Sequence, residues 1–159
     1  MELLEWIDGT QLAETIRGSE FIFPALETFH VIAVGLVLGS IAIVDMRLVG
    51  LAAHHRAISE VSHDMLPWTW VAFIAATVFG VLLFAGTPIK YVAMPFFDIK
   101  ILLIVLAGIN MVVFEYVTSK SKAEWDSMPT PPLAVRLTGA LSLAFWVSVL
   151  LCGRFIGFV

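Results

Sequence analysis

Residues 65–86, MLPWTWVAFIAATVFGVLLFAG, decide the fold class of this chain, because none of these 22 residues is charged. A helix needs about 20 apolar residues to cross the roughly 30 Å hydrocarbon core of a bilayer. The whole chain of 159 residues is 60% hydrophobic and 14% charged, with a mean hydropathy of +0.96. A soluble domain is about half apolar and about a quarter charged. The sequence therefore predicts a membrane protein.

Three further apolar runs predict three further spans. Residues 137–153 are uncharged, and so are residues 31–44 and 101–114. The last two runs are long enough to span only if the spans include the flanking polar residues Glu27, His30, Asp45, Asp98 and Lys100. We expect spans at about residues 21–53, 65–86, 94–117 and 133–157, which form an all-α bundle of four transmembrane helices. Residues 21–159 are then a single transmembrane domain.

The N-terminal segment, residues 1–20, is acidic but carries apolar residues at roughly helical spacing. This pattern predicts a short interfacial helix that begins near Thr10 and ends at Gly18, with Ser19 capping the first span. The segment lacks the basic start of a secretory signal, so we expect the first span to remain as an anchor. The single cysteine, Cys152, excludes a disulfide within the chain.

Basic residues favour one orientation, by five against four. One side carries Arg47, Arg56, Lys120, Lys122 and Arg136, and the other carries Arg17, Lys90, Lys100 and Arg154. The sequence predicts a bacterial inner-membrane protein with both termini in the periplasm.

Polar residues of the first span share one face. At about 100° per residue, Glu27, His30 and Asp45 point the same way, and this face should turn into the bundle. His30 and Asp45 are fifteen residues apart in the chain, which is about 22 Å at about 1.5 Å per residue. They cannot share one ligand.

The third span carries Lys100, Asn110 and Glu115 on a matching face. We expect a Lys100–Glu27 ion pair near the outer surface. Near the inner surface, Arg47 is expected to pair with Glu115 or Asp45, or else to extend toward the lipid headgroups. Together these residues form a predicted polar seam: Glu27, His30, Asp45, Arg47, Lys100, Asn110 and Glu115.

The seam has two interpretations. Matched ion pairs and hydrogen bonds can hold helices in register without any turnover. Alternatively, ionisable residues in a membrane can line a proton or ion path or a quinone pocket.

Haem b is a further possibility, because four-helix membrane bundles can hold haem between histidines. His30 is the histidine expected inside a span, and no second histidine lies at its depth. A site that uses Met94 or Met46 as the second ligand stays open. The loop histidines His54, His55 and His63 are candidate ligands for a divalent metal.

Residues 35–39, GLVLG, form a GxxxG pattern away from the polar face of the first span. Paired glycines of this kind allow two helices to approach closely. We therefore expect a close helix contact at Gly35 and Gly39.

Four stretches resemble a known family: ETFHVIAVGLVLGSIAIVDMRLVGL, LPWTWVAFIAATVFGVLLF, FFDIKILLIVLAGINMVVFE and the final GRFIGF. The chain is similar, from about residue 19 to 157, to a functionally uncharacterised family of small bacterial four-helix inner-membrane proteins. That family is distantly similar to the membrane part of copper-resistance protein D. Its recurring pieces map onto His30, Asp45, Arg47 and Leu48, Pro67 and Trp68, Lys100, Asn110, and Gly153 and Arg154. Relatives often carry histidine at the position of Glu115.

Two function classes follow. The first is a non-catalytic accessory or structural subunit that packs against a larger membrane complex. The second is a redox or transport module for haem b, a quinone, protons or copper, built on the seam around His30. We expect the partners to be the lipid bilayer and other membrane subunits, and not nucleic acid. No nucleotide loop or catalytic triad is present, so an independent enzyme is not expected.

Overall fold

The computed structural model describes residues 2–116 and 122–157, with the backbone alone at residues 115, 122 and 123. The described part is helical, with no strand, and confirms the predicted all-α bundle. The helices are α1 (Glu2–Asp8), α2 (Gln11–Gly18), α3 (Ile22–Val49), α4 (Ile58–Gly86), α5 (Pro88–Val92), α6 (Pro95–Tyr116), α7 (Lys122–Trp125) and α8 (Leu133–Ile156).

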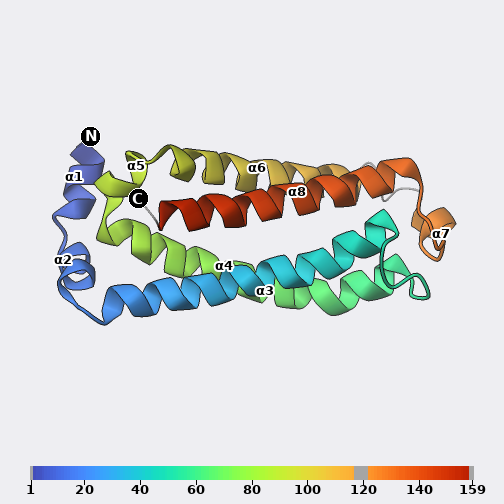
Figure 1. Ribbon diagram of the computed structural model, residues 1–159, viewed down its shortest axis with the longest axis horizontal. Helices are drawn as coiled ribbons and strands as arrows, with labels where there is room; N and C mark the ends of the chain where they lie inside the picture. The colour runs from blue at the N-terminus through green and yellow to red at the C-terminus, as the bar shows by residue number, and fades with distance from the viewer. Residues whose placement is uncertain (1, 117–121, 158–159) are drawn as a thin grey trace.

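The four long helices run along the long axis of the molecule, while α1 and α2 lie across one end and α7 lies at the other (Figure 1). We call these the α1–α2 end and the α7 end. Helix α3 packs along α4 and also against α8, and α6 packs along α8. Helices α3, α4, α6 and α8 are each long and apolar enough to cross a membrane. The chain is a multi-pass membrane protein.

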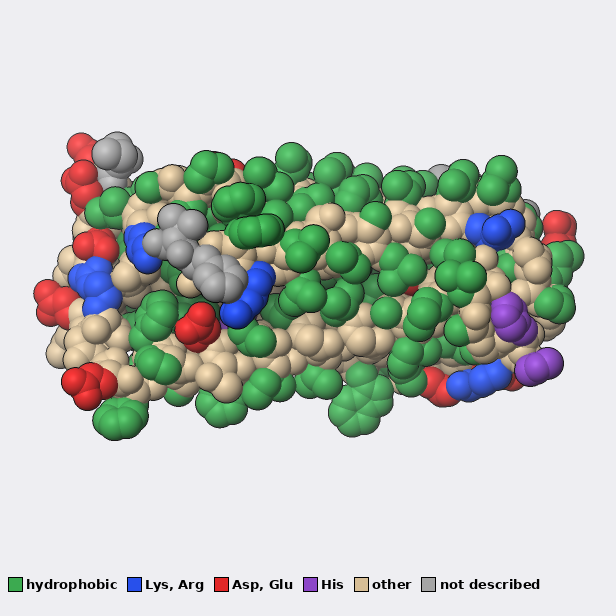
Figure 2. Space-filling view, in the orientation of Figure 1, with side chains coloured by type: hydrophobic (Ala, Val, Ile, Leu, Met, Phe, Trp, Pro, Cys, Tyr) green, Lys and Arg blue, Asp and Glu red, His purple; other side chains and the backbone are tan. Residues whose placement is uncertain are grey.

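The surface has the polarity that a membrane requires. In Figure 2, apolar side chains cover the middle of the visible face, most of the charged side chains gather toward the two ends, and the visible histidines lie at the α7 end. Many large apolar side chains are exposed along the spans, including Leu36, Ile74 and Leu102. These side chains face lipid, which is as apolar as they are.

Helix α4 begins earlier than the sequence predicts. The helix starts at Ile58 and passes through Pro67, which the sequence places at its start. Its first turn is stabilised by a distant segment, because Asp126 accepts hydrogen bonds from the amides of Ile58 and Ser59. These two bonds satisfy amides that a free helix N-terminus leaves without partners.

At the α1–α2 end, the predicted interfacial helix is α2. Thr10 caps it by accepting a hydrogen bond from the amide of Ala13, and Ile16 is buried against Gly86 of α4. Arg17 donates to the carbonyl oxygen of Gly86 at 3.0 Å, at the end of α4. Ser19 is not the N-cap of α3, which is Phe21, but its hydroxyl accepts from the amides of Phe21 and Ile22 at the start of this helix.

The α7 end has an apolar core that the sequence does not predict. Trp125, in a segment that reads as a polar loop, is only 3% exposed. It packs in a cluster with Val44, Leu48, Ile58, Val61 and Val135. This tryptophan fixes the loop between α6 and α8 to the bundle.

Candidate functional site

His30 lies in the half of α3 nearer the α1–α2 end, and its ring is held between α3 and α4. Its Nδ1 bonds the carbonyl oxygen of Ala76 at 2.8 Å. A carbonyl oxygen only accepts, so Nδ1 carries the proton, and in the neutral ring Nε2 keeps its lone pair. A Cβ added at Gly80 would lie 3.0 Å from His30 Cε1. Gly80 therefore provides the space that the imidazole occupies.

Lys100 and Glu27 both lie against the last turns of α8. A Cβ at Gly153 would lie 3.5 Å from Lys100 Nζ, and a Cβ at Gly157 would lie 3.9 Å from Glu27 Oε1. In the described part of the chain, no ion pair within 4.0 Å joins Lys100 to Glu27. The predicted pair is not formed, because the two side chains lie one turn apart along α8.

The polar group at this end has a further member in α5. Tyr91 is half-buried, and this burial together with the negative charge of Glu27 raises the pKa of its phenol. The Lys100 ammonium is close enough to act electrostatically on His30. The structure thus gathers His30, Lys100, Glu27 and Tyr91 at the depth that the sequence predicts for the first three.

Arg47 is fully buried at the α7 end, where it joins the two loops. Its Nε donates to the carbonyl oxygen of Arg56 at 2.8 Å, and its Nη2 donates to that of Met128 at 2.9 Å. A weaker contact reaches the carbonyl oxygen of Asp126 at 3.4 Å. The predicted pairing with Asp45 is wrong, and the side chain does not extend to the headgroups. The loops fold over the guanidinium and supply carbonyl oxygens instead.

The other predicted partner of Arg47, the side chain of Glu115, lies outside the described residues. Asp126 holds the same region together from the loop before α8. Its carboxylate accepts from the amide of Ser59 at 2.8 Å and also from the Ser59 hydroxyl. Arg47 and Asp126, together with their hydrogen bonds to the loops and to Ser59, form a loop clasp.

Asp45 and Asn110 lie on different helices that both face α8. Asp45 is 4% exposed, and the Ser142 hydroxyl of α8 lies beside its carboxyl. Asn110 donates to the carbonyl oxygen of Thr138 at 3.0 Å. The structure therefore divides the predicted seam into two polar groups, one near each end of the bundle.

The loop histidines lie at the α7 end. His54 bonds the carbonyl oxygen of Pro129 at 3.3 Å, and the largely exposed His63 lies 3.8 Å from a carboxylate oxygen of Asp64. His55 is exposed. Across residues 2–116 and 122–157, no group of three or more His, Cys, Asp or Glu side chains is placed to hold a metal ion. The structure does not gather these histidines into a metal centre.

A groove runs between α3 and α4 where the GxxxG pattern lies. It has a volume of about 490 Å³, and Gly35, Gly39, Phe29, Trp68 and Phe79 are among its lining residues. A Cβ at either glycine would meet nothing within 4 Å. The predicted close helix contact at these glycines is therefore not made within the described part of this chain.

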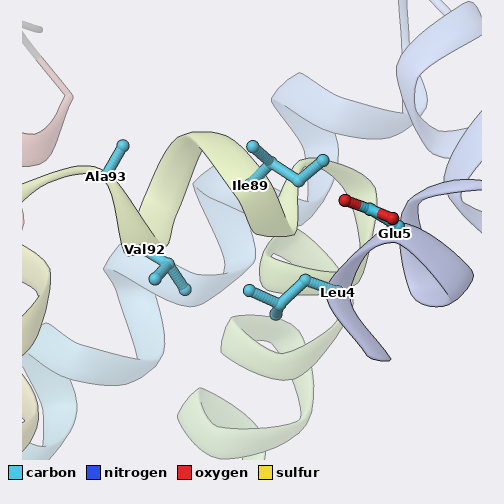
Figure 3. A pocket seen from close by; sticks show the side chains of 5 residues that line it. All are labelled: Leu4, Glu5, Ile89, Val92 and Ala93. Atoms are coloured by element: carbon cyan, nitrogen blue, oxygen red, sulfur yellow. The ribbon is translucent and has the colours of Figure 1, made fainter. Parts of the chain in front are cut away.

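A smaller apolar pocket of about 250 Å³ lies at the α1–α2 end. Figure 3 shows Leu4 and Glu5 of α1 facing Ile89 and Val92 of α5 across it. Its lining is almost wholly apolar. Glu5 is the one titratable residue among those that line it.

One known family matches this chain. The model of a family of unknown function, DUF6644, matches residues 3–159. The chain belongs to this family. No curated protein and no solved structure matches it. The distant similarity of this DUF6644 protein to copper-resistance protein D stays a prediction.

Sequence reasoning missed several residues that hold the polar groups of this DUF6644 protein. Asp126 lies in a loop and Ser142 in an apolar run, and neither stands out by type or spacing. Gly80 and Gly153 give room to His30 and Lys100. A glycine inside an apolar helix is the one available signal for such close approaches.

Proposed function

We propose that this protein is a non-catalytic subunit of a larger membrane complex, which it joins by receiving a transmembrane helix of a partner protein in the α3–α4 groove. The open groove at Gly35 and Gly39 carries this proposal. Lipid and apolar side chains are equally apolar, so helices in a membrane associate through close packing, and small residues mark the surfaces where they do so. Here two glycines one turn apart are exposed at the base of a groove.

The walls of the groove support a helix as its occupant. Phe29 and Phe79 stack across its α1–α2 side with ring centroids 5.5 Å apart, and Trp68 lines it farther toward the α7 end. Ser40, which also lines the groove, accepts from the Thr69 hydroxyl at 2.7 Å and donates to the carbonyl oxygen of Leu36. These hydroxyls are already bonded, so the groove offers shape and dispersion contacts rather than chemistry.

A matched pair of substitutions tests this proposal. Gly39→Leu fills the groove, and Gly108→Leu adds the same side chain to α6, where a Cβ also meets nothing within 4 Å. Because a Cβ meets nothing at either position, we expect both variants to fold. Tagged protein is purified from its native membranes in mild detergent, and co-purifying proteins are quantified by mass spectrometry.

We expect a stoichiometric membrane protein to co-purify with the wild type and with Gly108→Leu, and to be lost with Gly39→Leu. A wild type that purifies without such a partner would refute the subunit role. Equal retention by both variants would refute the groove as the contact.

A second candidate, the redox or transport module, is favoured by the orientation of His30. Its Nδ1 donates to the carbonyl oxygen of Ala76, so Nε2 of the neutral ring carries the lone pair that could bind a metal or accept a hydrogen bond. The other three of the four histidines, His54, His55 and His63, lie at the α7 end, so one chain cannot supply a two-histidine haem site.

The visible spectrum of the purified protein tests this candidate. A Soret band, with sharp α bands after reduction by dithionite, would support it and would identify haem b. A colourless protein whose groove variant loses its partner would favour the subunit role.

We also propose the predicted orientation, with the α7 end in the cytoplasm of a bacterial cell and both termini in the periplasm. The exposed Arg56 and Arg136 at that end support it. Fusions of a periplasm-active and a cytoplasm-active reporter to the C-terminus, compared in activity, test this orientation.

A further inference from the structure

Asp45 is a buried carboxyl group without a compensating charge. It is 4% exposed, and its Oδ2 has no hydrogen-bond partner among the described residues. The Ser142 hydroxyl lies beside the carboxyl. A Cβ at Gly139 of α8 would lie 3.0 Å from the backbone carbonyl oxygen of Asp45. The side chain is therefore enclosed where α3 packs tightly on α8.

The charged groups nearest in the chain and on the loops are engaged elsewhere. Arg47, two residues on, donates to the carbonyl oxygens of Arg56 and Met128. Asp126 accepts from Ser59. In the described part of the chain, no cation lies within 4.0 Å of the Asp45 carboxyl.

The neighbouring helices bring no free charge to Asp45 either. On α4, Asp64 pairs with Arg56 at 2.6 Å on the surface. On α8, the exposed Arg136 donates to the carbonyl oxygen of Val49. On α6, the uncharged Asn110 faces α8, and the Glu115 side chain lies outside the described residues.

A carboxylate in such a place is strongly unfavourable, because it loses its hydration and gains only the Ser142 hydroxyl, with no opposite charge to compensate. A bound divalent cation would need six or more oxygen ligands, which one carboxyl and one hydroxyl do not supply. A proton needs no such shell. A protonated carboxyl also becomes a hydrogen-bond donor, and the Ser142 oxygen beside it can accept.

We propose that Asp45 is a proton-binding site within the bundle, which is occupied at neutral pH and exchanges its proton through the α7 end. Asp45 lies four residues from the end of α3 at Val49, which is about 6 Å along the helix axis. The α7 end is therefore the nearer end of the bundle to this site. This inference does not depend on the subunit role.

Infrared difference spectroscopy of the protein in lipid vesicles tests the site. Wild type minus Asp45→Asn should show the carbonyl stretch of a protonated carboxylic acid at neutral pH, and this band should shift in deuterated water. Glu27→Gln, which changes an exposed carboxyl of the same helix, is the control and should leave the band intact. Ser142→Ala should move the frequency of the band without removing it, because it removes the hydrogen-bond acceptor.

Labelling with dicyclohexylcarbodiimide provides an independent readout. The reagent takes up the proton of the acid on nitrogen, and its central carbon bonds to the carboxyl oxygen, so the adduct has the summed mass of protein and reagent. Labelling at Asp45 should occur in the wild type and in Glu27→Gln, and should be lost in Asp45→Asn.

Two results would overturn the proposal. The first is the absence of a protonated-acid band that depends on Asp45. The second is a band that disappears when sodium replaces potassium, because the site would then bind a metal cation.

Discussion

Replacing Arg47 with methionine should destabilise the protein strongly, although methionine keeps the unbranched apolar stem of the arginine side chain and lacks only the guanidinium group. The variant loses the hydrogen bonds to Arg56 and Met128, at 2.8 and 2.9 Å. Hydrogen bonds from a charged donor contribute about 1.5–3 kcal/mol each, so the pair contributes about 3–6 kcal/mol. The contact of 3.4 Å to Asp126 is too long to add much.

Part of this loss is offset. Nη1 of Arg47 is buried with no partner among the described residues, and removing such a group recovers about 1–3 kcal/mol. Taken at the middle of each range, about 4.5 minus about 2 kcal/mol, the net expectation is a decrease of about 2.5 kcal/mol in the free energy of unfolding. Arg47→Lys should lie between wild type and methionine, because an ammonium can reach one of the carbonyl oxygens but lacks the planar fork that reaches both.

Equilibrium unfolding in mixed micelles with increasing SDS measures this effect. Tryptophan fluorescence is a suitable signal, since the buried Trp125 packs beside the loop clasp. Arg136→Met is the matched control, because Arg136 is exposed and makes a single bond of 3.2 Å to Val49. Its effect should stay below about 1 kcal/mol. If Arg47→Met lies within about 0.5 kcal/mol of wild type, the range of ordinary surface changes, the clasp does not stabilise the fold.

Three further predictions concern other contacts. Gly139→Ala should lower the free energy of unfolding by about 1–3 kcal/mol, because the added Cβ would lie 2.8 Å from Leu48 Cβ and would push α3 away from α8. An unfolding midpoint in SDS equal to that of wild type would contradict this. Asp126→Ala should lower the free energy of unfolding by about 1–2 kcal/mol, because the Ser59 amide in the first turn of α4 loses its carboxylate acceptor. Amide hydrogen exchange at the start of α4 should therefore accelerate. Unchanged exchange there would argue against this capping role. Tyr91 has a pKa raised in the fold, so its contribution is present below the pKa of a free phenol, about 10, and is lost as pH rises through the higher folded value. As pH rises above about 10, the free energy of unfolding should therefore fall less for Tyr91→Phe than for wild type. Identical pH dependence of unfolding in the two proteins would count against the raised pKa.

The candidate site could be predicted from the sequence only in part. Helical spacing places Glu27, His30 and Lys100 at one depth, and the structure brings them to one end of the bundle. The same spacing does not predict which groups bond, because a bond depends on the rotation of each helix about its own axis. His30 therefore bonds the backbone at Ala76 rather than a side chain of the seam.

The sequence by itself determined the membrane class, the four spans and most of their ends, because the length and polarity of an apolar run are local properties. It could not determine the start of α4 or the partners of Arg47. Those depend on Asp126 and Met128, which are far along the chain and lie close to α3 and α4 because the packing of α8 against α3 brings the preceding loop there. The tertiary structure also decided that Gly35 and Gly39 line a groove, since a glycine pair permits a close contact but does not itself provide the helix that would make it.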